Sequence, residues 1–72
     1  MTTKGEYKVG IDFNPSGDDT VNKIKRSAAD LIDIVDGITS SEGEVARLKA
    51  LACTAIEEGA MWGVKAATKK PQ

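Results

Sequence analysis

The chain has 72 residues, with one cysteine and no histidine, and its ten basic side chains nearly balance eleven acidic ones for a net charge of −1. A chain this short forms one domain at most, and its core is small because only roughly 60% of the unfolded surface is buried on folding. The composition excludes an intrachain disulfide and a zinc set, and the charge balance argues against a general DNA or RNA binder.

Residues 6–13 alternate apolar and polar side chains, which is the period of a strand. The apolar members are Tyr7, Val9, Ile11 and Phe13. Because no second strand is predicted, we interpret residues 1–17 as an extended arm and a turn that pack on helices. The turn contains Pro15, which fixes φ, and Gly17, which accepts a positive φ.

Residues 18–38 are predicted to form the first helix. Asp18 or Asp19 can cap its start, and Gly37 is placed to end it. Apolar residues recur at alternating spacings of three and four, as in a narrow coiled-coil seam: Val21, Ile24, Ala28, Leu31, Val35 and Ile38. Lys25 flanks this seam, whereas Lys23 lies on the outward side.

The loop 39–41 is short, so the second helix, residues 42–69, must return antiparallel to the first. Two capping-box patterns precede it, Ser41 with Glu44 and Thr39 with Glu42. Residues 70–72 are predicted to be a tail.

The second helix is predicted to be apolar on two sides. One broad face comprises Val45, Leu48, Leu51, Ala52, Ala55, Ile56, Gly59, Trp62 and Ala66. The other side contains Ala46, Ala50, Cys53, Ala60, Met61 and Val64, with Cys53 read as a small buried hydrophobe. One helix cannot cover both sides, so a further copy of the chain is needed. The predicted fold class is therefore all-α: an antiparallel two-helix hairpin with a short extended N-terminal arm, one domain over residues 1–72, assembled as a homo-oligomer.

No catalytic constellation is present, so we predict that the protein is not an enzyme and needs no metal and no cofactor. Histidine is absent, and the adjacent Glu57 and Glu58 point about 100° apart on a helix, as solvated side chains do. No apolar run is long enough to span a bilayer, so a cytoplasmic location without membrane association is expected. The cations Lys65 and Lys69 lie on or near a polar stripe of the second helix.

The run T-A-I-E-E-G-A-M-W, residues 54–62, resembles a signature of the phage helical-hairpin family that includes the anti-CBASS and anti-Thoeris nucleotide sponges. In that family an alanine-rich stretch follows and ends in a basic residue, a place that Lys69 occupies here, and Trp62 is read as core. The F-N-P turn at residues 13–15 and the Ile24–Lys25 pair resemble the family's N-terminal half. Several members have tyrosine where Phe13 stands, many have histidine in place of Asn14, and Lys69 lacks the bidentate fork of arginine.

The resemblance implies a phage anti-defence protein of the host bacterial cytoplasm that binds cyclic oligonucleotide immune messengers and sequesters them without cleavage. It favours a homohexamer and no binding of DNA or RNA. Lys25 is then expected to contact a phosphate, with Tyr7 or Phe13 stacking on a base at a twofold interface that suits a cyclic dinucleotide. Lys65 and Lys69 are expected to form a second site for a cyclic trinucleotide on a threefold axis, far along the hairpin from the first.

Two other functions stay open from the sequence. An oligomeric hairpin could dock a host or phage protein, in which case Lys25 and Lys69 are ordinary surface residues. A nucleic-acid binder would show strongly salt-dependent DNA binding, which the charge balance disfavours.

Overall fold

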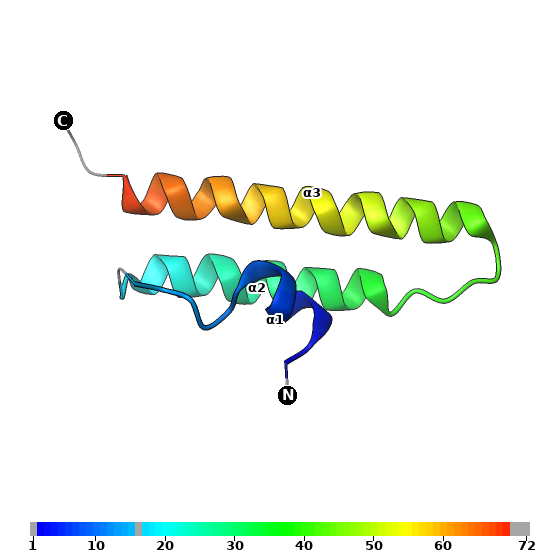
Figure 1. Ribbon diagram of the computed structural model, residues 1–72, viewed down its shortest axis with the longest axis horizontal. Coiled ribbons are helices and arrows are strands. Elements are labelled where there is room, and N and C mark those ends of the chain that lie inside the picture. Colours follow the sequence, from blue (N-terminus) through cyan, green and yellow to red (C-terminus); the bar gives the residue numbers. More distant parts are fainter. Residues whose placement is uncertain (1, 16, 70–72) are drawn as a thin grey trace.

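A computed structural model describes residues 2–15 and 17–69 and contains three helices in this part of the chain. They are α1 (Lys4–Val9), α2 (Asp19–Asp36) and α3 (Gly43–Thr68). Helices α2 and α3 lie side by side and run in opposite directions, and the short α1 lies across the middle of α2 (Figure 1). The predicted antiparallel hairpin is confirmed.

The extended arm predicted for residues 6–13 is wrong, because residues 4–9 form the helix α1. A capping box starts this helix: the Thr3 hydroxyl accepts from the Glu6 amide at 3.1 Å, and the Glu6 carboxylate accepts from the Thr3 amide at 2.8 Å. Gly10 ends it in the left-handed region, at φ 62°. So short a helix is unstable alone and depends on the surface beneath it.

Helix α1 sits directly on α2 because Gly5 has no side chain. A Cβ at Gly5 would lie 2.0 Å from the Ala29 carbonyl oxygen, and the Gly5 amide donates to the Asp33 carboxylate at 2.7 Å. Ion pairs flank this contact, with Lys4 bound to Asp36 at 3.1 Å. The backbone of α1 therefore touches the backbone of α2.

Helix α2 is capped by Asp18, whose side chain accepts from the Thr20 amide at 2.7 Å, as predicted for one of the two candidate caps. Its buried residues are Val21, Lys25, Ala28, Ala29 and Ile32. The predicted seam is wrong in part, since Leu31 and Ile38 stay about half exposed. Helix α1 covers the neighbouring side of α2 instead and shifts the buried stripe.

Glu42 is the N-cap residue of α3, and its side chain makes no capping hydrogen bond, so neither predicted capping box forms. The Ser40 hydroxyl accepts from the Glu42 amide in the loop, and the Lys49 ammonium donates to the Asp36 carbonyl at 2.9 Å. That lysine ties α3 to the end of α2.

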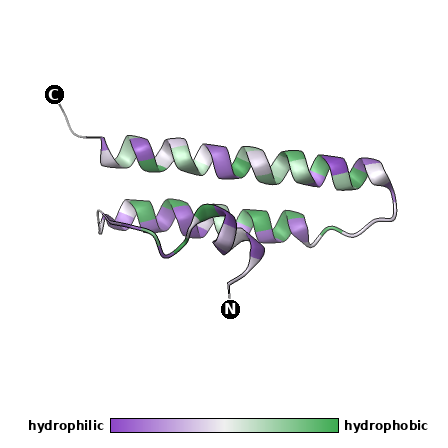
Figure 2. Ribbon diagram, viewed as in Figure 1, coloured by the Kyte–Doolittle hydropathy of each residue, from purple (hydrophilic) through white to green (hydrophobic). Residues whose placement is uncertain are grey.

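Helix α3 turns a different face to the hairpin from the one predicted. Cys53 and Ala60 are its buried residues, whereas Leu48, Leu51 and Trp62 are more than half exposed. The reading of Trp62 as core is thus wrong for the single chain. Hydrophobic segments recur along the length of α3 (Figure 2). The molecule is flat and elongated, with extents of 49 × 28 × 12 Å. Helix α1 covers only part of the hairpin, and the side of α3 that contains Leu48, Leu51 and Trp62 stays uncovered.

Candidate functional site

Lys25, in the first half of α2, is a buried cation held by backbone carbonyls. Only 7% of the residue is exposed, and its ammonium donates to the carbonyl oxygens of Gly10, at 2.9 Å, and Phe13. The segment after α1 wraps over α2 to bring these carbonyls to Lys25. Lys25 is therefore more enclosed than the edge of a helical seam implies.

Phe13 lies beside this cation, with the Lys25 ammonium 5.4 Å from the centre of the ring, within cation–π range. The residue is 72% exposed. The structure thus brings Lys25 and Phe13 together, as the site prediction needs, and leaves the aromatic ring open to a planar group.

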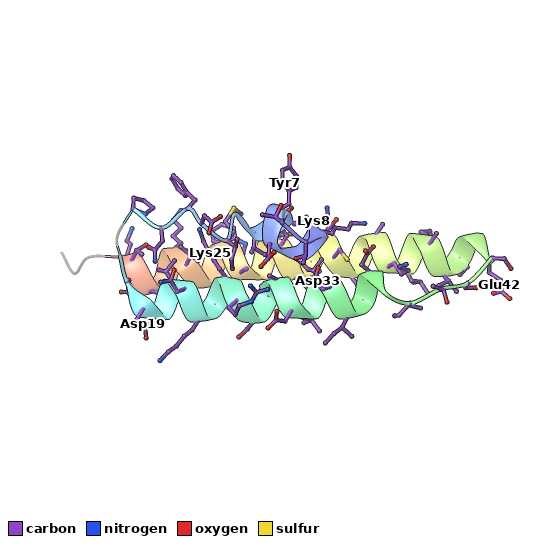
Figure 3. The ribbon with its side chains drawn as sticks, turned by 90° about the horizontal axis from the view of Figure 1, so that it is seen from below. Tyr7, Lys8, Asp19, Lys25, Asp33 and Glu42 are labelled. Carbon is purple, nitrogen blue, oxygen red and sulfur yellow. The ribbon has the colours of Figure 1, made fainter. Side chains whose placement is uncertain are left out.

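Tyr7 is not part of this cluster. It is 80% exposed and projects away from the hairpin (Figure 3). It lines neither of the two grooves that Lys25 lines. Of the two aromatic candidates, the structure brings only Phe13 to Lys25.

One of these grooves, which we call the turn groove, lies between residues 13–15 and the end of α3. It has a volume of about 200 Å³. The side chains around it come from all parts of this end of the hairpin: Phe13, Asn14, Pro15, Val21, Lys25, Val64 and Thr68.

The second groove, which we call the charged groove, lies between α1 and α3 and has a volume of about 570 Å³. Lys8 and Lys25 bring positive charge to it, and Thr54, Glu57 and Glu58 bring oxygen acceptors from α3. The rest of its lining is apolar: Val9, Ala60, Met61 and Val64. An apolar lining with a few opposed polar groups is typical of small-molecule sites.

Lys65 and Lys69 lie at the end of α3, where cations favour the negative end of the helix dipole. The Lys65 ammonium is 5.4 Å from the centre of the Trp62 ring. The expectation that this pair lies far along the hairpin from Lys25 is wrong. Val64 and Thr68, which directly precede Lys65 and Lys69 in the sequence, line the turn groove together with Lys25.

Charged contacts fix α1, and hence Lys8, above the hairpin. Arg26 pairs with Glu6 at 2.7 Å and with Asp30 at 2.8 Å. The hydrogen bond from Arg26, helped by the Thr3 amide, lowers the pKa of Glu6 below its ordinary value. The hydrogen bonds that Arg26 donates, first to Glu6 and second to Asp30, raise the pKa of Arg26.

A family described as Acb2/Tad1, hairpin domain, matches residues 6–68 of the sequence. The chain belongs to this family. The family comprises the cyclic-nucleotide sponges of phage anti-CBASS and anti-Thoeris proteins, so the resemblance read from the sequence is confirmed. Comparisons with curated proteins and with solved structures gave no match.

Members of the Acb2/Tad1 family carry a binding domain of the sponge type, and no enzyme activity is known for the family. In the described part of this member, no helix has the length and apolar character needed to cross a bilayer. A binding domain of this type agrees with the site, which offers cations, an open aromatic ring and two grooves.

The sequence reading missed the charged groove altogether. The sequence predicts solvated side chains for Glu57 and Glu58 and an extended arm around Lys8, yet all three residues line one groove. The T-x-x-E spacing of Thr3 and Glu6 was the available local signal, because it marks a helix start. That signal would have placed Lys8 on a helix.

Proposed function

We propose that this chain is a phage anti-defence protein that binds cyclic oligonucleotide immune messengers and withholds them intact, acting in the cytoplasm of the infected bacterium. The observation that carries the proposal is the Lys25–Phe13 pair in a member of the Acb2/Tad1 family. Cyclic oligonucleotides present phosphates beside flat bases, so they need a cation next to an aromatic ring.

Lys25 is well suited to the phosphate. An ammonium has three protons, of which two point to the carbonyls of Gly10 and Phe13. The third is available to a phosphate oxygen that enters through either groove, while the exposed Phe13 ring stacks on the attached base.

We further propose that the working form is a homo-oligomer, with a hexamer favoured. The chain exposes 5240 Å². A compact monomer of this mass exposes about 4,300 Å², so the excess of about 900 Å² resembles the ~800 Å² per partner of a stable interface. The exposed apolar side chains of α3, which include Leu48, Leu51 and Trp62, support the same proposal.

In such an assembly Lys25 and Phe13 form a site for a cyclic dinucleotide near a twofold axis. Lys65 and Lys69, beside Trp62, form a site for a cyclic trinucleotide near a threefold axis. Neither site needs a catalytic group, because withholding a messenger requires tight binding without turnover.

Calorimetric titration with a panel of cyclic di- and trinucleotides tests the proposal. Phe13→Ala and Lys25→Ala should each weaken dinucleotide binding, the latter at least tenfold, because a charge-assisted contact contributes about 1.5–3 kcal/mol. Lys23→Ala is the matched control, since among the described residues Lys23 pairs only with Asp19, on the exposed side of α2. Circular dichroism and light scattering establish that each variant keeps its fold and assembly.

Three results would overturn parts of this scheme. Absence of binding to every cyclic nucleotide would leave the hairpin as a protein-docking module. Equal, small effects of the Lys23 and Lys25 substitutions would remove Lys25 from the site. Linear nucleotide appearing over time, instead of intact ligand recovered after denaturation, would mean cleavage.

A further inference from the structure

The charged groove has opposed charges that the fold itself does not use. Among residues 2–15 and 17–69, the side chains of Lys8, Glu57 and Glu58 take part in no ion pair or hydrogen bond, whereas the carboxylates of Glu6, Asp19, Asp30, Asp36 and Glu44 all form ion pairs. Glu57 is also half-buried, so its carboxylate has lost part of its hydration. A carboxylate in this position gains most from a ligand that donates hydrogen bonds.

The groove has room for one nucleotide unit. Its volume of about 570 Å³ lies within the roughly 300–1,000 Å³ of small-molecule sites. Met61 and Val9 provide apolar surface for a flat ring, and Lys25 connects the groove to the Phe13 side. A nucleotide whose phosphate contacts Lys25 can thus extend its base toward α3.

We propose that Glu57 reads the edge of a guanine base in this groove, which makes the protein selective for guanine-containing cyclic nucleotides; the inference rests on the proposed function. A carboxylate has two acceptor oxygens side by side and no donor. Guanine alone among the common bases presents two adjacent donors, N1–H and the 2-amino group. Its neighbouring O6 is an acceptor, which suits the ammonium of Lys8.

Adenine and uracil offer Glu57 fewer hydrogen-bond donors than guanine does, and they also place acceptor atoms that the carboxylate repels. Adenine places its N1 lone pair beside a single amino group, and uracil flanks one N–H with two carbonyls. Either base would hold an acceptor against the carboxylate in a half-buried place, which costs affinity. The selectivity thus arises at α3 and is separate from the phosphate contact at Lys25.

Calorimetry of the full chain with cyclic di-GMP, cyclic di-AMP and the inosine analogue cyclic di-IMP tests this assignment. We expect wild-type protein to prefer cyclic di-GMP over cyclic di-AMP by at least about tenfold, the usual discrimination of a two-bond contact. Cyclic di-IMP, which lacks only the 2-amino group, should fall between them. Glu57→Gln should remove the preference, because its amide presents one acceptor and one donor.

Glu42→Gln, at the start of α3 and outside the charged groove, is the matched control and should keep the preference (Figure 3). Equal affinity of the wild type for cyclic di-GMP and cyclic di-AMP overturns the inference and leaves the proposed function standing. Loss of the preference in Glu58→Gln but not in Glu57→Gln also overturns it. Binding of neither ligand, nor of any other cyclic nucleotide, overturns the proposed function itself.

Discussion

Replacing Gly5 by alanine should detach α1 from the hairpin. The new Cβ would lie 2.0 Å from the Ala29 carbonyl oxygen, whereas real Cβ contacts essentially never fall below 3.0 Å. The helix must therefore retreat by about 1 Å, since the obstacle is backbone and cannot rotate away. The same movement stretches the 2.7 Å bond from the Gly5 amide to Asp33 beyond the ~3.2 Å limit of good geometry.

The size of the effect follows from two opposed terms. A hydrogen bond to a charged acceptor contributes about 1.5–3 kcal/mol, which is lost. Alanine gains up to about 1 kcal/mol over glycine inside a helix. Gly43→Ala, at the start of α3, is the matched control because nothing lies within 4 Å of its Cβ. The difference between the two variants isolates the clash.

Thermal unfolding followed by circular dichroism, at one protein concentration, measures this difference. With about 4–8 °C per kcal/mol for a domain of this size, Gly5→Ala should unfold at least about 6 °C below Gly43→Ala. Amides of α1 should also exchange faster in Gly5→Ala. Equal unfolding temperatures together with unchanged protection of α1 would refute the backbone-to-backbone packing.

Three further predictions concern charge, assembly and the buried cation. The pKa of Glu6 is lower in the folded chain than in the unfolded chain. Its ionised carboxylate therefore contributes fully to the stability of the fold above the ordinary pKa of about 4.3, and this contribution is lost as the pH falls through the lowered pKa. Acid should thus loosen α1, which hydrogen exchange of its amides would detect, and Glu6→Gln should abolish this dependence on pH. Gly59→Leu should break the oligomer, since overpacking costs about 1–3 kcal/mol per site; a wild-type monomer in light scattering at micromolar concentration would contradict this. Lys25→Met should destabilise the fold by about 1–3 kcal/mol by leaving two carbonyls without a donor, and chemical denaturation of Lys23→Met provides the comparison.

The hairpin was predictable because its signals are local. The spacing of Val21 and Ala28 predicts a helix. The predicted loop of three residues is so short that the next helix must run antiparallel to the first. The rotation of α3 was not predictable, because both of its sides are apolar and the pattern cannot say which side meets α2. The face with Cys53 packs within the chain, and the face with Trp62 stays open.

The site was predictable only as a list of residues. Lys25 and Phe13 follow from the family's motif, and they do lie together. The burial of Lys25 depends on α1 folding back over α2, a contact over a distance in sequence that periodicity does not encode. Period-2 alternation at Tyr7 and Val9 favoured a strand, yet tertiary docking through Gly5 decided for a helix.

The carbonyl cradle of Lys25 has a thermodynamic consequence for any anion that reaches it. A surface lysine gives up about 1.5–2 kcal/mol of side-chain entropy when a ligand immobilises it. Lys25 has already lost that freedom during folding, since Gly10 and Phe13 fix its ammonium. The entropy cost of ordering this ammonium therefore lowers the stability of the folded protein, and it no longer lowers the affinity for the ligand. Affinity and foldedness are thus coupled through a single side chain.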